Sequence, residues 1–232
     1  MANDKNGNSF LTNKSFNEFI IVIGLGFGLF IYSSTYNAFF NSKAEISQTY
    51  NSYDFIFICL YELLVISIII KYLKHRKWIY NDFNLHFSLG MILVALSLIV
   101  FREILGFILT FIFEQTEILK ASEKETEINI YSGFFSILLI TIINSIYEEV
   151  LLIGYIFKRL EKLHPALVIS ISFIIRESFH TYQGLENLPM VLSISIVFGL
   201  YYYKFKKLWP IILAHGISNS IKFANEHFHW FN

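Results

Sequence analysis

The chain has 232 residues, of which 55% are hydrophobic and 18% aromatic, and its 18 basic and 18 acidic residues give a formal net charge of zero. A soluble domain of this length needs far more polar surface than this composition provides. The balanced charge gives no indication of a nucleic-acid partner. A single cysteine, Cys59, lies in an apolar run, so a monomer holds no disulfide framework.

The apolar residues fall in blocks of about 20 residues, the length that a helix needs to cross a bilayer. A membrane β-barrel would show short segments of alternating hydrophobicity instead. We therefore predict an all-α fold, a multi-pass transmembrane helical bundle of about seven spans. In chain order the predicted spans are Phe16–Phe40, Tyr53–Tyr72, His86–Phe113, Ile130–Phe157, Pro165–Thr181, Leu188–Tyr203 and Leu208–Phe223.

The connections between these spans differ in charge, which predicts an orientation. The connection after the third span is rich in glutamate, whereas basic clusters follow the second, fourth and sixth spans. These clusters are Lys71, Lys74, Arg76 and Lys77; Lys158, Arg159 and Lys162; and Lys204, Lys206 and Lys207. Because basic connections favour the cytoplasm, we expect a cytoplasmic N-terminus and an outer C-terminus.

No linker, internal repeat or low-complexity tract divides the chain. We predict accessory transmembrane spans over residues 1–129 and a functional core over residues 130–225.

The fourth predicted span contains two adjacent carboxylates, Glu148 and Glu149. A charge at the bilayer centre costs several kcal/mol, so each of the two needs a reason to be there. Neighbouring positions on a helix differ by about 100°, so the two side chains cannot serve one partner in the same way. One could face a catalytic water while the other holds a neighbouring side chain, or both could be neutralised structural groups at a helix contact.

The later spans add further polar residues. Arg176 and His180 are four residues apart, and so are His215 and Asn219, so each pair shares one helical face. Arg176 must find an anion or reach the surface, whereas polar side chains such as His and Asn also join membrane helices without any chemical role. Together with the glutamates, the set suits activation of a water by Glu and His with donors for an oxyanion. It also suits a divalent metal held by Glu and His, although no HExxH helix is present.

Charges in the second and third spans have simpler interpretations. Arg102 and Glu103 are expected to pair with other spans and pack the bundle. Glu62 is either a structural hydrogen-bond partner or part of the lining of a water-filled cavity.

The C-terminal half resembles the CAAX prenyl protease 2-like intramembrane proteases, also called the Abi or CPBP family. Glu148-Glu149-Val-Leu-Leu-Ile153 is similar to the family's Glu-Glu-x-x-x-Arg motif. Arg176-Glu-Ser-Phe-His180 takes the place of Phe-x-x-x-His, and His215-Gly-Ile-Ser-Asn219 that of His-x-x-x-Asn/Asp. The resemblance implies that Glu148 and His180 activate the attacking water, that His215 and Asn219 stabilise the oxyanion, and that Glu149 orients the site.

Two positions depart from the family pattern. Ile153 stands where the family has arginine, and Arg176 stands where the second motif usually has phenylalanine. The first change removes a cationic partner expected for Glu149. We hypothesise that Arg176, on the adjacent span, supplies that guanidinium instead.

The predicted function is therefore an intramembrane endopeptidase in a cell membrane, and the range of the family favours a bacterial plasma membrane. Its expected partners are the lipid bilayer and a membrane-associated protein or peptide as substrate. The glutamic mechanism needs no cofactor, and a divalent metal such as zinc is the open alternative. A catalytically impaired bacteriocin-immunity or membrane binding protein is the second interpretation, and a proton-coupled transporter is the third.

Overall fold

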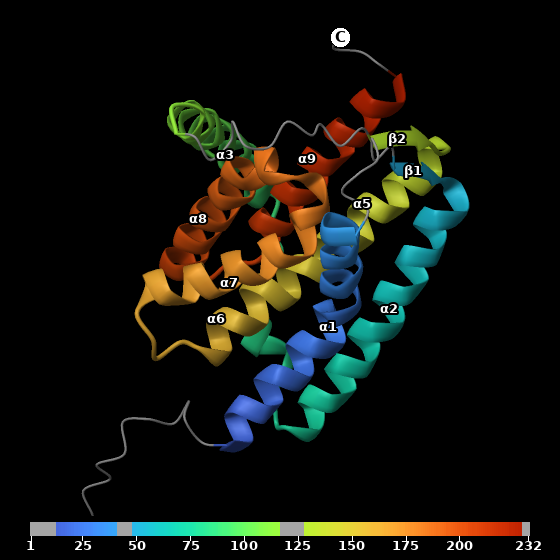
Figure 1. Ribbon diagram of the computed structural model, residues 1–232. Coiled ribbons are helices and arrows are strands. Elements are labelled where there is room, and N and C mark those ends of the chain that lie inside the picture. Colours follow the sequence, from blue (N-terminus) through green and yellow to red (C-terminus); the bar gives the residue numbers. More distant parts are fainter. Residues whose placement is uncertain (1–12, 41–47, 117–127, 229–232) are drawn as a thin grey trace, which may run out of the picture.

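The computed structural model describes residues 13–40, 48–116 and 128–228, which form a bundle of helices (Figure 1). The helices are α1 (Asn13–Phe40), α2 (Ser52–His75), α3 (Gly90–Glu114), α5 (Phe134–Glu149), α6 (Ile156–Arg159), α7 (Pro165–His180), α8 (Leu188–Phe205) and α9 (Trp209–Phe228). A π-helical turn, Val150–Tyr155, joins α5 to α6 without a break. Short 3₁₀ turns occur at Tyr80–Phe83, Thr181–Gln183 and Leu185–Asn187.

The predicted all-α membrane bundle is confirmed, since each of the seven predicted spans contains a helix. Five helical segments are long and apolar enough to cross a membrane: α1, α2, α3, the continuous segment from α5 to α6, and α8. The helices of the two remaining predicted spans, α7 and α9, are less typical of membrane-crossing helices. Helix α7 has only 16 residues, and α9 carries several polar side chains among its 20 residues.

Local sequence explains where several helices begin. The side chain of Asn51 accepts hydrogen bonds from the backbone N–H groups of Tyr53 and Asp54, and the Asp54 carboxylate accepts one from the backbone N–H of Asn51. These bonds form a capping box at the start of α2. Helices α7 and α8 have a proline in their first turn, where no backbone N–H is needed.

Two short strands were not expected from the sequence. Strand β1 (Gln48–Asn51) pairs in parallel with β2 (Ile128–Tyr131), and Tyr50 lies opposite Ile130 in the register. The span predicted to start at Ile130 therefore begins as a strand, and its helix starts only after Gly133. Strands of four residues carry too little periodic pattern to be distinguished from the start of an apolar helix.

The segment from α5 to α6 is the central helix of the bundle. In this segment 67% of the apolar window is buried, against 17% to 39% in the other four candidate spans. All six residues of the π-helical turn are buried. The Ser172 hydroxyl of α7 donates a 3.0 Å hydrogen bond to the Leu152 carbonyl in that turn, where the regular ladder of the helix is interrupted.

Helix α1 approaches this central helix closely at Gly26. A Cβ atom at this position would lie 2.9 Å from Leu151 Cδ1, and the Tyr147 hydroxyl donates to the Gly26 carbonyl. The ring of Phe27 also stacks on Phe179 of α7 at 4.9 Å. Helix α1 therefore packs directly against the central helix, and the proposed division at residue 130 stays a prediction.

The three basic connections meet at one end of the bundle. The backbone N–H of Leu208 donates to the Asn84 carbonyl at 3.4 Å, and the Trp209 indole donates to the Leu85 carbonyl at 3.3 Å. Lys158 lies 3.8 Å from Asp82. The basic clusters thus share one side, as the sequence predicted, while the membrane face to which that side belongs stays a prediction. The glutamate-rich stretch 117–127 lies outside the described residues.

Candidate active site

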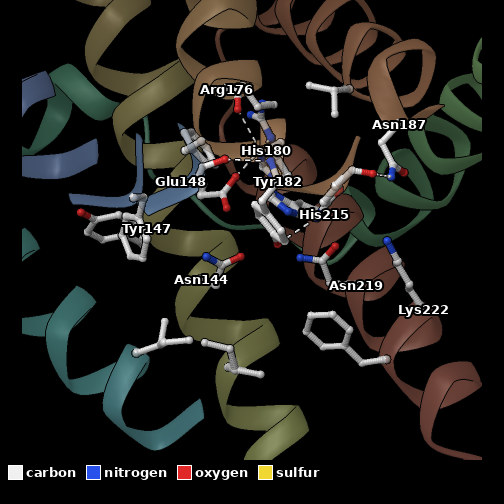
Figure 2. A pocket seen from close by; sticks show the side chains of 18 of the residues that line it. Asn144, Tyr147, Glu148, Arg176, His180, Tyr182, Asn187, His215, Asn219 and Lys222 are labelled. Carbon is white, nitrogen blue, oxygen red and sulfur yellow. Dashed lines mark hydrogen bonds and ion pairs between the residues drawn. The ribbon is translucent and has the colours of Figure 1, made fainter. Parts of the chain in front are cut away.

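A cavity of about 460 Å³ lies inside the bundle, and the polar side chains singled out in the sequence line it (Figure 2). Helix α5 contributes Glu148, α7 contributes Arg176 and His180, and α9 contributes His215 and Asn219. Glu149 lies beneath the wall and is fully buried. Three helices that are separate in sequence therefore bring all six predicted residues to one place.

Glu149 and Arg176 form the core of this arrangement. The Arg176 Nη2 atom donates hydrogen bonds to both carboxylate oxygens of Glu149, at 2.8 and 3.0 Å. Its Nη1 atom lies 3.4 Å from Glu148 Oε2. Because the Arg176 side chain is only 2% exposed, the guanidinium and the two carboxylates compensate one another away from water. The guanidinium expected for Glu149 is thus supplied from α7, at the position where the second family motif usually has phenylalanine.

His215 contacts the same carboxylate. Its Nδ1 atom lies 2.6 Å from Glu149 Oε1, and both side chains are buried. An ionised carboxylate only accepts, so Nδ1 carries the hydrogen of this bond and the Nε2 atom is left for other contacts. Glu149 consequently joins α5, α7 and α9 through charge-assisted hydrogen bonds, and it fixes the His215 ring at the cavity wall.

The second histidine is fixed by the backbone. His180 Nδ1 lies 2.9 Å from the Arg176 carbonyl oxygen, one turn earlier on α7. A carbonyl oxygen cannot donate, so Nδ1 carries a hydrogen and Nε2 holds the lone pair of the neutral ring. Glu148 and His180 both line the cavity, and Figure 2 shows them as neighbours. This pair can accept protons at the cavity surface.

Further polar residues in the cavity wall were not singled out as part of a site. Asn144 lies one turn before Glu148 and donates a 2.8 Å hydrogen bond to Oε1 of Glu62 on α2. Glu62 is only 1% exposed, so it is a buried hydrogen-bond partner, and it also lies in the cavity wall. The spacing of four residues between Asn144 and Glu148 was a usable signal, because such residues share one helical face. Tyr182, Asn187 and Lys222 also line the cavity, at positions outside the three motifs.

Arg102 corrects one expectation. Among the described residues, Arg102 forms its ion pair with Glu103, the next residue of α3, rather than with another span. Its side chain also contributes to the cavity wall. Adjacent residues of a helix seldom face one another, so sequence spacing gave no reason to expect this pair.

Among the described residues, one group could hold a metal ion: Glu148, Glu149 and His215, whose ligand atoms lie within 4.8 Å of one another. The contacts of this group fit a metal poorly. Both oxygens of Glu149 already accept from Arg176, and His215 Nδ1 is directed at Glu149 as well. A divalent cation among these atoms would have to displace a guanidinium of the same charge sign, which electrostatic repulsion opposes.

Residues 130–221 match the family model described as type II CAAX prenyl endopeptidase, Rce1-like. The predicted family resemblance is confirmed. The Rce1-like segment contains Glu148, Glu149, Arg176, His180, His215 and Asn219, and it covers the central helix with α7, α8 and most of α9. No curated protein and no solved structure matches the chain. The matched family is one of endopeptidases, which agrees with a helical membrane protein that carries buried Glu, His and Arg side chains around a cavity.

Proposed function

We propose that this protein is an intramembrane endopeptidase that hydrolyses a peptide bond in a membrane-associated protein or peptide. One observation carries the proposal: residues of three family-like motifs, on α5, α7 and α9, converge on a single cavity within an apolar bundle. The cavity of about 460 Å³ falls in the size range of binding sites for small molecules and peptide segments.

In the proposed mechanism, Glu148 and His180 activate a water. Glu148 accepts one proton as the water oxygen attacks the carbonyl carbon of the substrate, and His180 Nε2 accepts a hydrogen bond from the same water. The new C–O bond converts the carbonyl into a tetrahedral oxyanion. When the C–N bond breaks, the proton held by Glu148 passes to the leaving amine, which returns the glutamate to its ionised form.

His215 and Asn219 are the proposed donors to the oxyanion. Asn219 donates through its side-chain amide, and His215 donates through Nε2. Since Nδ1 of His215 already donates to Glu149, donation by Nε2 requires the imidazolium form. The Glu149 carboxylate stabilises this cation, and Arg176 holds the carboxylate in place. We therefore assign Glu149 and Arg176 positioning roles in a metal-independent, glutamic mechanism.

The alternative function is a catalytically impaired family member that acts in immunity or by binding. The observation in its favour is Ile153, a fully buried apolar side chain at the position of the family arginine. Substitution of Glu148 by Gln separates the two functions. It abolishes hydrolysis if the protein is a peptidase, and it leaves a protective effect intact if the protein acts by binding.

The deciding experiment compares peptide termini from the membrane and secreted fractions of cells that express wild type, Glu148→Gln or the control Glu186→Gln. Glu186 is an exposed residue in a connection, so its substitution makes the same chemical change at a position that does not line the cavity. We expect new termini with wild type and with the control but not with Glu148→Gln, at equal protein levels. Identical termini in all three, with a cellular phenotype that survives Glu148→Gln, would overturn the peptidase proposal.

A further inference from the structure

A second cavity, of about 380 Å³, lies at the end of the bundle where the basic connections meet. Its wall combines five basic side chains with an indole and two leucines. The lining residues are Ser15, Arg76, Lys77, Trp78, Asp82, Lys158, Arg159, Leu160, Glu161, Lys162 and Leu163. They come from the start of α1, the connection after α2, the end of α6 and the connection that follows it.

A buried carboxylate holds the two arginines of this wall. Glu18 of α1 is 2% exposed and accepts hydrogen bonds from Arg76 Nε at 2.9 Å and from the Trp78 indole at 3.1 Å. Arg159 Nε lies 3.5 Å from Glu18 Oε1, the oxygen that accepts from Trp78. The buried Arg159 Nε atom makes no hydrogen bond within the described part of the chain. One carboxylate therefore faces two guanidinium groups, which leaves a positive charge at this point of the wall.

The remaining charges make the pocket more positive. Lys158 has two acidic neighbours, Glu161 at 3.2 Å and Asp82 at 3.8 Å. Lys77 and Lys162 lie within 4 Å of no acidic group in the part of the chain that the structure describes. Counting Glu18 behind the wall, five basic groups stand against three acidic ones, and 5 − 3 gives a net charge of +2.

The backbone at Lys77 has a conformation that lysine rarely adopts. Its φ of 69° lies in the left-handed region, at the end of α2 where glycine is the usual residue. A lysine there costs about 1 kcal/mol relative to glycine. This strained position is one whose side chain lines the basic pocket.

We propose that this pocket binds the phosphate group of an anionic phospholipid. Basic pockets between membrane helices on the cytoplasmic side are typical sites for such headgroups. Arg76 donates through Nε to Glu18 and through Nη2 to the Lys14 carbonyl, so its Nη1 and the Nη atoms of Arg159 are the groups proposed to bind phosphate oxygens, and the lysines add charge. Trp78 and Leu163 provide apolar surface for the glycerol and upper acyl region of the same lipid. The proposal rests on this end of the bundle alone and is independent of the peptidase proposal.

The test measures lipid retained by the purified full chain in native mass spectrometry after exchange into nanodiscs of phosphatidylglycerol or phosphatidylcholine. Two variants remove pocket charge, Lys77→Gln with Lys162→Gln, and Lys77→Gly alone. The matched control, Lys71→Gln with Lys74→Gln, removes two charges from the same end of α2 at positions that do not line the pocket. Inorganic phosphate is added as a competitor in a separate series.

We expect wild type and the control to retain phosphatidylglycerol in preference to phosphatidylcholine. We expect the double pocket variant to retain at least about tenfold less phosphatidylglycerol than wild type. Lys77→Gly should lose retention while its thermal midpoint stays equal to that of wild type or rises, because glycine relieves the backbone. Equal loss in the control, or no preference between the lipids, would overturn the site. Displacement of the lipid by millimolar inorganic phosphate would overturn the assignment to a lipid and leave a site for free phosphate.

Discussion

Arg176 on α7 contacts both carboxylates of the adjacent pair on α5, with two hydrogen bonds to Glu149 and a longer contact to Glu148. The arginine that the family places four residues after its second glutamate is replaced here by Ile153. The charge that this family arginine would bring is therefore present, but it comes from a different helix.

The first prediction concerns this exchange of position. We expect Arg176→Phe to lower hydrolysis by about 10²-fold or more, because Glu149 loses its cation and no longer fixes His215. Adding Ile153→Arg to Arg176→Phe restores the family pattern at both positions and should recover part of the activity. Peptide termini in cells, together with the level of folded protein, are the measurements. Full activity of Arg176→Phe alone would contradict the positioning role.

Arg176→Lys serves as a second test of the same contact. Lysine keeps the charge but lacks the planar fork that contacts both carboxylates, so we expect a loss of activity similar to that of Arg176→Phe and a smaller loss of stability. Activity equal to wild type would show that charge alone is enough.

The second prediction separates the two glutamates. Glu149→Gln removes the charge that faces the buried Arg176 and leaves Glu148, at 3.4 Å, as its remaining carboxylate partner, so we expect the free energy of unfolding to fall by about 3–5 kcal/mol. Glu148→Gln keeps the pair between Arg176 and Glu149, so its stability should stay within about 1 kcal/mol of wild type while its hydrolysis is lost. Thermal unfolding in detergent measures the change in stability of both variants. Equal destabilisation by both variants would remove the distinction between a structural and a chemical carboxylate.

The third prediction concerns the contact between α2 and α5. Asn144→Ala removes the amide donor to the Glu62 carboxylate, which is 1% exposed, so we expect a destabilisation of about 1–3 kcal/mol. Glu62→Gln keeps an oxygen that can accept from Asn144 and should cost less. The double variant Asn144→Ala, Glu62→Leu removes both polar partners and should be more stable than Asn144→Ala alone. Additive losses in the double variant would show that the two side chains are not coupled.

The fourth prediction addresses the metal. Since Arg176 and His215 already use the oxygens of Glu149, we expect hydrolysis to withstand dialysis against EDTA and 1,10-phenanthroline. The activity of a zinc-dependent peptidase in the same chelators is the positive control. Loss of activity that added zinc restores would favour the metal alternative and would require Arg176 to leave Glu149 when the ion binds.

The sequence was sufficient for the helical spans and for the residues of the three motifs, because apolar length and the cost of buried charge are strong signals in a membrane protein. It did not predict the contact between Asn144 and Glu62, because a hydrogen bond between spans has no fixed sequence separation. The same holds for Glu18, whose partners Arg76 and Arg159 are far away along the chain. Strands β1 and β2 are too short to show a period, and the π-helical turn has the same composition as the helix around it.

That π-helical turn separates two regions that need particular directions on one helix. Glu148 and Glu149 precede the turn. Glu148 lines the cavity and Glu149 accepts hydrogen bonds from Arg176, whereas Arg159 follows the turn and faces Glu18. Successive residues of an α-helix are offset by about 100°, so deleting one residue within Val150–Tyr155 would rotate everything beyond it by roughly that angle. The turn therefore fixes the angle about the helix axis between the glutamates at the cavity and Arg159 at the basic end. An insertion or deletion in the turn would change this angle and disturb both sets of contacts, although it alters none of these residues.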